Sequence, residues 1–180
     1  PGTRLRRKMT TTPTIREALG AGRWFPGRPA ELKRMVDGYI DAAAPPPVKG
    51  RIVSAIAPHA GYVYSGAVAG HTFRALRGNA VTHPVITVVV LGFTHRQSFS
   101  GLALMDGAAI RTPLGETALD RATGETIVRA SGCVRWEYAP HAGEWSAENE
   151  IPFVQAALPH AKLVVGLFGA AYGLSIGHGR

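Results

Sequence analysis

Two stretches of sequence decide the fold expected for this chain: Ile52-Val53-Ser54-Ala55-Ile56-Ala57-Pro58-His59-Ala60-Gly61-Tyr62 and Ile86-Thr87-Val88-Val89-Val90-Leu91-Gly92-Phe93-Thr94-His95-Arg96. Each begins with a short apolar run rich in β-branched residues, which favours a strand over a helix. Each run leads into a turn with a glycine and a histidine, His59 in the first and His95 in the second. Ligands of open α/β sheets bind outside the carboxyl ends of the strands. The pattern therefore predicts two imidazoles that face one ligand or one metal ion.

The surrounding sequence predicts alternating strands and helices. Strands are expected at 51–57, 85–91, 99–104 and 162–168, helices at 29–44, 65–76, 120–130 and 151–158, and a turn at 111–116. The first two strands and the helix between them form a βαβ unit with an expected right-handed crossover. The second strand is apolar throughout, which is typical of a strand covered on both faces. Gly66 and Gly70 are expected to let their helix lie close against the sheet. The predicted fold class is α/β, in three α/β/α layers around a mostly parallel central sheet.

Charge and composition exclude several classes of protein. The formal net charge of +8 falls to +4 when the four basic residues before Met9 are left out, and the remaining basic residues are scattered among acids. Nucleic acid is therefore not expected as a partner. Apolar runs are about a strand long, too short for a membrane span. The single cysteine, Cys133, is expected to be a small buried residue, and it fits a reducing, cytoplasmic compartment.

Three segments are expected along the chain. Residues 1–14 are basic and rich in threonine, and we expect them to be disordered. Residues 15–168 form the α/β domain. Residues 169–180 show no clear period or polar boundary, and we expect an atypical tail that results from truncation or a frame shift.

Further candidate residues have both a functional and a structural interpretation. His59 and His95 are metal ligands or acid/base groups in one interpretation, and partners of neighbouring loops in the other. His141 with Glu144 and Glu148 offers a metal-binding group or a solvated polar loop. Tyr62 is either a hydrogen-bond donor in a pocket or an aromatic residue packed at a helix entry. Three other histidines are expected to be structural or exposed, namely His71, His83 and His160.

Four motifs, in order, resemble those of one known family. Residues 57–66 read APHAGYVYSG, close to APHAGYxYSG; residues 91–95 read LGFTH, close to LGPSH. Residues 111–115 read RTPLG, and residues 16–26 resemble an opening R…AGxWYP. By these motifs the chain is identified as a member of the Memo family, whose bacterial relatives are often called AmmeMemoRadiSam system protein B.

The resemblance implies a fold like that of class III extradiol dioxygenases of the LigB type. Those enzymes use a non-haem iron held by two histidines and a carboxylate, and the corresponding vestibule of Memo proteins is lined by two histidines and a cysteine from the C-terminal part. By motif, His59 and His95 match the two histidines. The resemblance thus implies an iron or copper ion and a redox activity, on a substrate that it does not settle.

Two departures from the family pattern bear on this expectation. The family usually shows EHSxExxxPF, whereas here Trp145 stands in place of the histidine, and indole cannot ligate a metal. The chain also ends before the family's C-terminal part, so the third ligand is missing, and we name Glu148 or Glu144 as possible substitutes. Glu148 or Tyr62 is expected to orient substrate or shuttle a proton, and Glu144, Tyr62 and Trp145 to contact substrate.

Three hypotheses on function remain open from the sequence. The first is a metal-dependent oxidoreductase, dioxygenase-like, with His59 and His95 as ligands and His59, His95 and Glu148 as catalytic residues. The second is a non-catalytic module that captures a peptide or a small molecule in the same cleft. The third is an inactive fragment.

Overall fold

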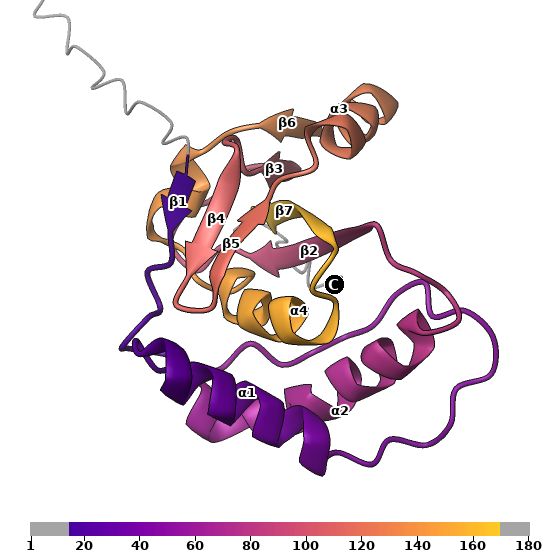
Figure 1. Cartoon of the computed structure of the whole chain (residues 1–180). Coiled ribbons are helices and arrows are strands. Elements are labelled where there is room, and N and C mark those ends of the chain that lie inside the picture. The colour runs from indigo at the N-terminus through magenta and orange to yellow at the C-terminus, as the bar shows by residue number, and fades with distance from the viewer. Residues whose placement is uncertain (1–14, 170–180) are drawn as a thin grey trace, which may run out of the picture.

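The computed structural model describes residues 15–169 and shows a mixed α/β fold with two sheets (Figure 1). Residues 1–14 and 170–180 lie outside the described residues. The expectation of a disordered start and most of the expectation of an atypical tail fall on these segments. In chain order the elements are β1 (Ile15–Glu17), α1 (Pro29–Ala42), α2 (Tyr62–Ala80), β2 (Thr87–Phe93), β3 (Leu102–Leu104), β4 (Ala109–Thr112), β5 (Gly115–Ala118), α3 (Arg121–Ala130), β6 (Val134–Trp136), the 3₁₀ helices η1 (Ala139–Gly143) and η2 (Glu148–Glu150), α4 (Ile151–Ala157) and β7 (Lys162–Phe168).

The larger sheet has the strand order β2-β7-β3-β6, with β7 near its centre. β2 runs parallel to β7 and β3 runs parallel to β6, while β3 is antiparallel to β7. Five consecutive residues of β7, Leu163 to Leu167, are buried. This strand is therefore covered on both faces, as its continuous apolar sequence requires.

The smaller sheet has the order β1-β4-β5 and brings the start of the described chain into the fold. β4 and β5 form an antiparallel hairpin in which Thr112 pairs with Gly115, so the predicted turn at 111–116 is confirmed. The two short strands that flank the turn are not predicted from the sequence, because RTPLGET lacks the β-branched alternation of a typical strand. β1 adds to this sheet parallel to β4.

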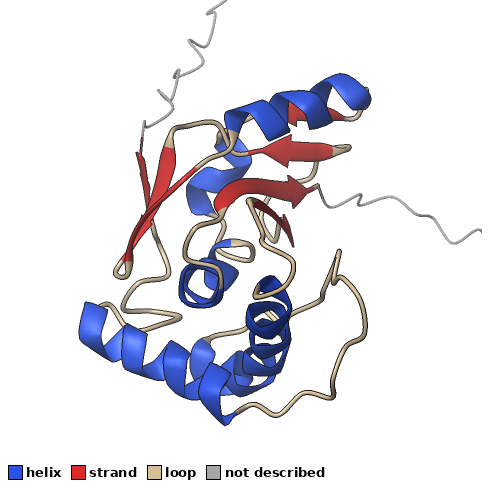
Figure 2. Cartoon of the chain, turned by 45° about the vertical axis from the view of Figure 1, so that its right-hand side comes forward, coloured by secondary structure: helices blue, strands red, loops and turns tan. Residues whose placement is uncertain are grey.

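The four α helices occupy different parts of the molecule. α1 and α2 lie side by side, and Figures 1 and 2 both show α3 at the opposite end. α1 begins with Pro29 at its first turn and buries Leu32, Val36 and Ile40 on one face, as the apolar spacing predicts. Together with the sheets, these helices are compatible with the expected three-layer α/β/α arrangement. No helix in the described part of the chain is long and apolar enough to cross a membrane.

The strand predicted at 51–57 is wrong, because these residues pair with no strand in the structure. Their backbone groups bind side chains of α2 instead: the N–H of Ile52 donates to the Asn79 side chain at 3.0 Å, and Thr72 donates to the Ile56 carbonyl at 2.9 Å. A cavity of about 630 Å³ separates this segment from β2. The expected βαβ unit therefore lacks its first strand.

Because residues 51–57 form no strand, the environment of β2 also differs from the prediction. The sequence predicts a strand at 85–91 covered on both faces, but the observed strand is an edge strand with only Val90 buried. Val89, Leu91 and Phe93 are 43%, 50% and 48% exposed. The position of the strand is thus nearly as predicted, whereas its coverage is not.

Gly66 and Gly70 allow a close approach of α2 to α1, not to the sheet as expected from the sequence. A Cβ atom at Gly66 would collide with the ring of Tyr39, and one at Gly70 would collide with the backbone carbonyl of Tyr39. The ring of Tyr39 is anchored, since its hydroxyl donates to the Tyr62 carbonyl at 3.0 Å. The two glycines therefore set the distance between these helices.

Replacing Gly70 by alanine should lower the free energy of unfolding by about 1–3 kcal/mol, because a backbone atom of α1 cannot move aside cheaply. Gly78→Ala is the matched control in the same helix, where a Cβ atom meets nothing within 4 Å. That control should stabilise the protein by about 0.5–1 kcal/mol through helix propensity. Urea unfolding measures both changes. Equal effects of the two substitutions would contradict the close packing of α1 against α2.

Candidate functional site

His95 lies two residues beyond the end of β2, as the sequence predicts. Its side chain is 51% exposed. The loop that holds it is closed by Thr94, whose buried hydroxyl accepts hydrogen bonds from the backbone N–H groups of Arg96 and Gln97 at 3.3 and 3.1 Å. The backbone around His95 is thus fixed while its imidazole faces outward.

His59 lies in the loop that enters α2, and not at the end of a strand. Ser65 in the first turn of α2 donates to the carbonyls of Pro58 and Ala60 at 3.3 and 3.2 Å. The carbonyl of His59 itself accepts a hydrogen bond of 2.8 Å from the side chain of Asn149, a buried residue. The loop of His59 is therefore held by the first turn of α2 and by Asn149, and not by a preceding strand as predicted.

The two imidazoles meet although only one of them follows a strand. Their ring centroids are 5.5 Å apart, with the ring planes inclined at 59°. Within residues 15–169, no group of three or more His, Cys, Asp or Glu side chains is arranged to hold a metal ion. Among the described residues, the structure thus brings the predicted pair of histidines together without a third such side chain placed to share an ion with them.

Glu144 binds His95 at two points, through the backbone and through the ring. Its Oε2 accepts the backbone N–H of His95 at 2.7 Å, and its Oε1 lies 3.1 Å from Nδ1 of the same imidazole. Burial by itself raises the pKa of Glu144, but hydrogen bonds from the backbone of His95, Ser146 and Trp145 and from the His95 ring reverse this, so the net shift of the pKa is downward. Glu144 is therefore an ionised acceptor, and Nδ1 of His95 has to bear the hydrogen, which leaves Nε2 free as a ligand atom.

The segment from Glu144 to Asn149, called the 144–149 segment below, packs against the end of β2. Ser146 donates from its hydroxyl to the Phe93 carbonyl at 2.9 Å and accepts from the Phe93 N–H at 3.2 Å. A Cβ atom at Gly92 would lie 2.7 Å from the backbone nitrogen of Ala147. Gly92 is needed here for this close approach, and not for a turn as the sequence suggests.

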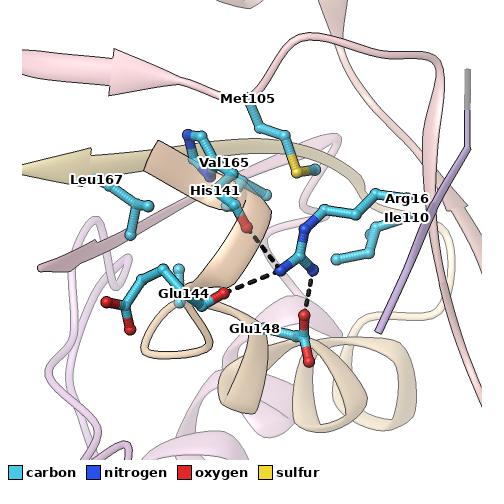
Figure 3. Close-up of a pocket in the computed structure, with 9 residues that line it drawn as sticks. Arg16, Met105, Ile110, His141, Glu144, Glu148, Val165 and Leu167 are labelled. Atoms are coloured by element: carbon cyan, nitrogen blue, oxygen red, sulfur yellow. Dashed lines mark hydrogen bonds and ion pairs between the residues drawn. The ribbon is translucent and has the colours of Figure 1, made fainter. Parts of the chain in front are cut away.

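A buried ion pair anchors the 144–149 segment to β1. The guanidinium of Arg16 pairs with the carboxylate of Glu148 and also donates to the carbonyls of His141 and Glu144 at 3.0 and 2.9 Å, as Figure 3 shows. The other Glu148 oxygen accepts the N–H of Gly20 at 2.6 Å. Arg16 and Glu148 are 4% and 3% exposed. The space that they line measures only about 10 Å³, so it holds no substrate.

His141 is buried in the same region, and not part of a solvated loop. Burial of the ring, together with the nearby charge of Arg16, lowers the pKa of His141 to about 4, and the hydrogen bond to the Ala103 carbonyl opposes this shift. The ring is therefore neutral at pH 7 and donates from Nε2 to that carbonyl at 3.0 Å. The side chains of His141, Glu144 and Glu148 thus bind different groups, namely the Ala103 carbonyl, His95 and Arg16.

Tyr62 and Trp145 differ in burial. Tyr62 is 2% exposed, its hydroxyl donates to the Asn149 carbonyl at 2.7 Å, and its ring packs on Phe25 and Phe153. Burial raises the pKa of Tyr62 well above its usual value. The ring of Trp145 is partly exposed and stacks on Trp24, with centroids 5.4 Å apart. Trp145, unlike Tyr62, therefore offers surface to a ligand.

The remaining candidates lie away from these loops. His71 and His160 are exposed, and His83 is partly exposed with Nδ1 2.9 Å from the Thr82 hydroxyl, so the expectation that they are structural or exposed is confirmed. Cys133 is exposed, which contradicts the prediction that it is buried, because it lies in a turn after α3 and contacts Ser131 at 3.0 Å.

Sequence reasoning missed three residues that build the site: Arg16, Trp24 and Asn149. Arg16 and Trp24 belong to the opening motif, and Asn149 lies between two glutamates in the polar stretch that was singled out. Their long-range partners have no local signal, since Arg16 meets Glu148 and Asn149 meets the loop of His59 only after folding. The high density of polar residues before the helix at 151 was a usable signal. If such a segment is buried, its polar side chains have to form hydrogen bonds within the protein.

Comparisons with known proteins agree on one family. The model of the Memo-like protein family matches residues 16–169. The chain is 35% identical over 156 residues to a MEMO1 family protein of Methanothermobacter thermautotrophicus, a match that covers 83% of this chain and 55% of the relative. It is 34% identical to a MEMO1 family protein of Methanopyrus kandleri, over 75% of this chain and 49% of that relative. The chain thus spans about half the length of the curated relatives it matches.

Glu148→Gln should lower the free energy of unfolding by about 3–5 kcal/mol, because it leaves the buried guanidinium of Arg16 without its counter-charge. Glu116→Gln is the matched control, since it breaks an exposed pair with Arg111 and should cost about 0–1 kcal/mol. Urea unfolding at pH 7 compares the two. A loss below about 1 kcal/mol for Glu148→Gln would show that the buried pair does not anchor the 144–149 segment.

Proposed function

The chain belongs to the Memo-like protein family, and from this premise we propose that His59 and His95 bind an iron or copper ion as part of an oxidoreductase. The observation that supports the proposal is the convergence of two imidazoles from distant loops, with ring centroids 5.5 Å apart. Imidazole nitrogen is a suitable ligand for both metals. Neither loop needs this arrangement for its own hydrogen bonds, which use the backbone of His59 and Nδ1 of His95.

Glu144 supports the proposal from behind His95. Metal-bound histidines usually donate their second ring nitrogen to a carboxylate or a carbonyl, which fixes the ring and its tautomer. Glu144 makes this contact at 3.1 Å from Nδ1, and its side chain is 2% exposed. It thus acts as an orienting residue, and Nε2 of His95 would be the atom that holds the ion.

Two imidazoles supply two of the three protein ligands of a 2-His-1-carboxylate site. In the described part of the chain, Glu144 is bound to His95 and Glu148 to Arg16, so neither carboxylate is free to complete the set. Glu148 and Tyr62 accordingly hold the site in shape in this proposal, while Trp145 contacts the substrate. The ion, when bound, supplies electron exchange or activation of dioxygen, and the substrate is a small molecule.

Because the chain spans about half of its relatives, the oxidoreductase activity is a proposal for the whole protein. A cytoplasmic location accords with the single cysteine of the sequence. The second candidate is a binding module without catalysis, which captures a small molecule or a peptide at the same place. The partly exposed Trp145 beside the histidines favours it as the alternative, since aromatic rings often anchor ligands.

Metal content provides the test of the proposed site. Protein prepared anaerobically and incubated with Fe²⁺ or Cu²⁺ should retain the ion after dialysis, and His59→Ala and His95→Ala should each abolish retention. His71→Ala, which removes an exposed histidine on α2, is the matched control and should retain the ion. Glu144→Gln should weaken binding by about 10–100-fold, because it removes the charge that orients His95.

Two outcomes would decide against parts of the proposal. Unchanged metal retention in both His59→Ala and His95→Ala would overturn the metal site. Retention of metal without oxygen consumption across a panel of catechols and thiols would reject the oxidoreductase and favour the binding module.

A further inference from the structure

We propose that a cluster of two arginines and two tryptophans beside the histidine pair binds the oxyanion of a small substrate, a carboxylate or a phosphate: Arg23, Arg96, Trp24 and Trp145. The proposal deepens the proposed function, because it names the chemistry of the molecule that would meet the histidines.

The two tryptophans connect the cluster to the two histidine loops. Trp145 follows Glu144, and its backbone N–H donates to the same Oε1 atom, at 2.9 Å, that binds the ring of His95. Trp24 accepts the N–H of Tyr62 on its carbonyl at 2.9 Å, and a Cβ atom at Gly61 would lie 3.2 Å from its ring. Each tryptophan is therefore fixed to one of the loops, and the indole rings stack where the loops meet.

Two guanidinium groups gather on this aromatic surface. The Cζ atom of Arg23 lies 5.2 Å from the ring centroid of Trp145 and 5.5 Å from that of Trp24, and the Cζ atom of Arg96 lies 4.8 Å from that of Trp145. These distances are within the range of cation–π attraction, which holds a guanidinium over a ring and leaves its edge free. Arg96 also follows His95 directly in the chain.

Neither guanidinium has an acidic partner among residues 15–169. The arginines that form ion pairs in this range are Arg16, Arg74, Arg77, Arg111, Arg121 and Arg135, and not Arg23 or Arg96. Glu144, the residue before Trp145, is already bound to His95 and to backbone N–H groups. Two positive charges thus lie over one ring without an acidic partner among the described residues, and an anion placed between them would be attracted by both.

The chemistry of the cluster selects the ligand class. Arginine presents parallel N–H groups that match the oxygens of a carboxylate or a phosphate, and such charge-assisted hydrogen bonds are stronger than neutral ones. The indole N–H of Trp24 is buried without a hydrogen-bond partner in the described residues, so the cluster holds a further unsatisfied donor. The two exposed guanidinium groups are both cations and donors, and an oxyanion satisfies both of them.

The test uses metal-free protein, so that it does not depend on the proposed metal site. Benzoate and phenyl phosphate are titrated while tryptophan fluorescence and binding heat are recorded, with benzyl alcohol as the neutral comparison. At least one anion should bind and benzyl alcohol should not, and the stronger anion identifies carboxylate or phosphate as the preferred group. Binding should weaken as salt rises.

Arg23→Gln combined with Arg96→Gln should weaken anion binding about tenfold or more, since charged hydrogen bonds are lost. Arg34→Gln, the same change at an exposed arginine of α1, is the matched control and should alter binding less than about twofold. Unfolding temperatures check that all variants fold, which their exposed positions favour. Equal binding by the double variant and the control, equal binding of benzyl alcohol, or no binding of either anion would overturn the proposal.

The outcomes are separable from those of the metal test. Anion binding that depends on the two arginines, without metal retention, would keep this inference and reject the metal site. Metal retention without anion binding would keep the metal site and reject this inference.

Discussion

The buried ion pair between Arg16 and Glu148 is the interaction on which the site depends. A charge inside a protein is costly unless it is paired and hydrogen-bonded, and here one guanidinium meets a carboxylate and two carbonyls at once. These contacts hold the 144–149 segment against β1, on the smaller sheet. From there Glu144 reaches the loop of His95, and Asn149 reaches the loop of His59. One anchored segment thus joins two loops that are far apart in sequence.

The main sequence patterns predict the helices and the core strand well. The spacing of Leu32, Val36 and Ile40 predicts α1, and the apolar run at 162–168 predicts β7, because local periodicity reflects which face is buried. The run at 51–57 has a strand-like composition but forms no strand, since Asn79 and Thr72 of α2 bind its backbone groups. Composition indicates that a segment can extend, whereas pairing depends on partners that local sequence does not specify.

The same distinction applies to the site. His59 and His95 could be named from the sequence, because each follows an apolar run and has a glycine nearby in the sequence, and the structure places their rings 5.5 Å apart. The residues that position these histidines could not be named from the sequence, since Arg16, Trp24 and Asn149 contact partners that are far away in the chain. Glu148, expected to be catalytic, lies in the buried ion pair, and the stacking of Trp145 on Trp24 follows only from the meeting of the two loops. The sequence thus identifies the exposed imidazoles better than the buried network that positions them.

The central claim is that two loops, joined by the 144–149 segment, present two imidazoles to a single ion. Nitrogen-15 spectra of histidine-labelled protein during a Zn²⁺ titration test it most directly, because zinc is diamagnetic and shifts the resonance of the nitrogen that it binds. The account predicts that the Nε2 resonance of His95 and one ring-nitrogen resonance of His59 move together and saturate at one zinc ion per chain. Movement of only one of them, or saturation of the two at separate zinc concentrations, would contradict it.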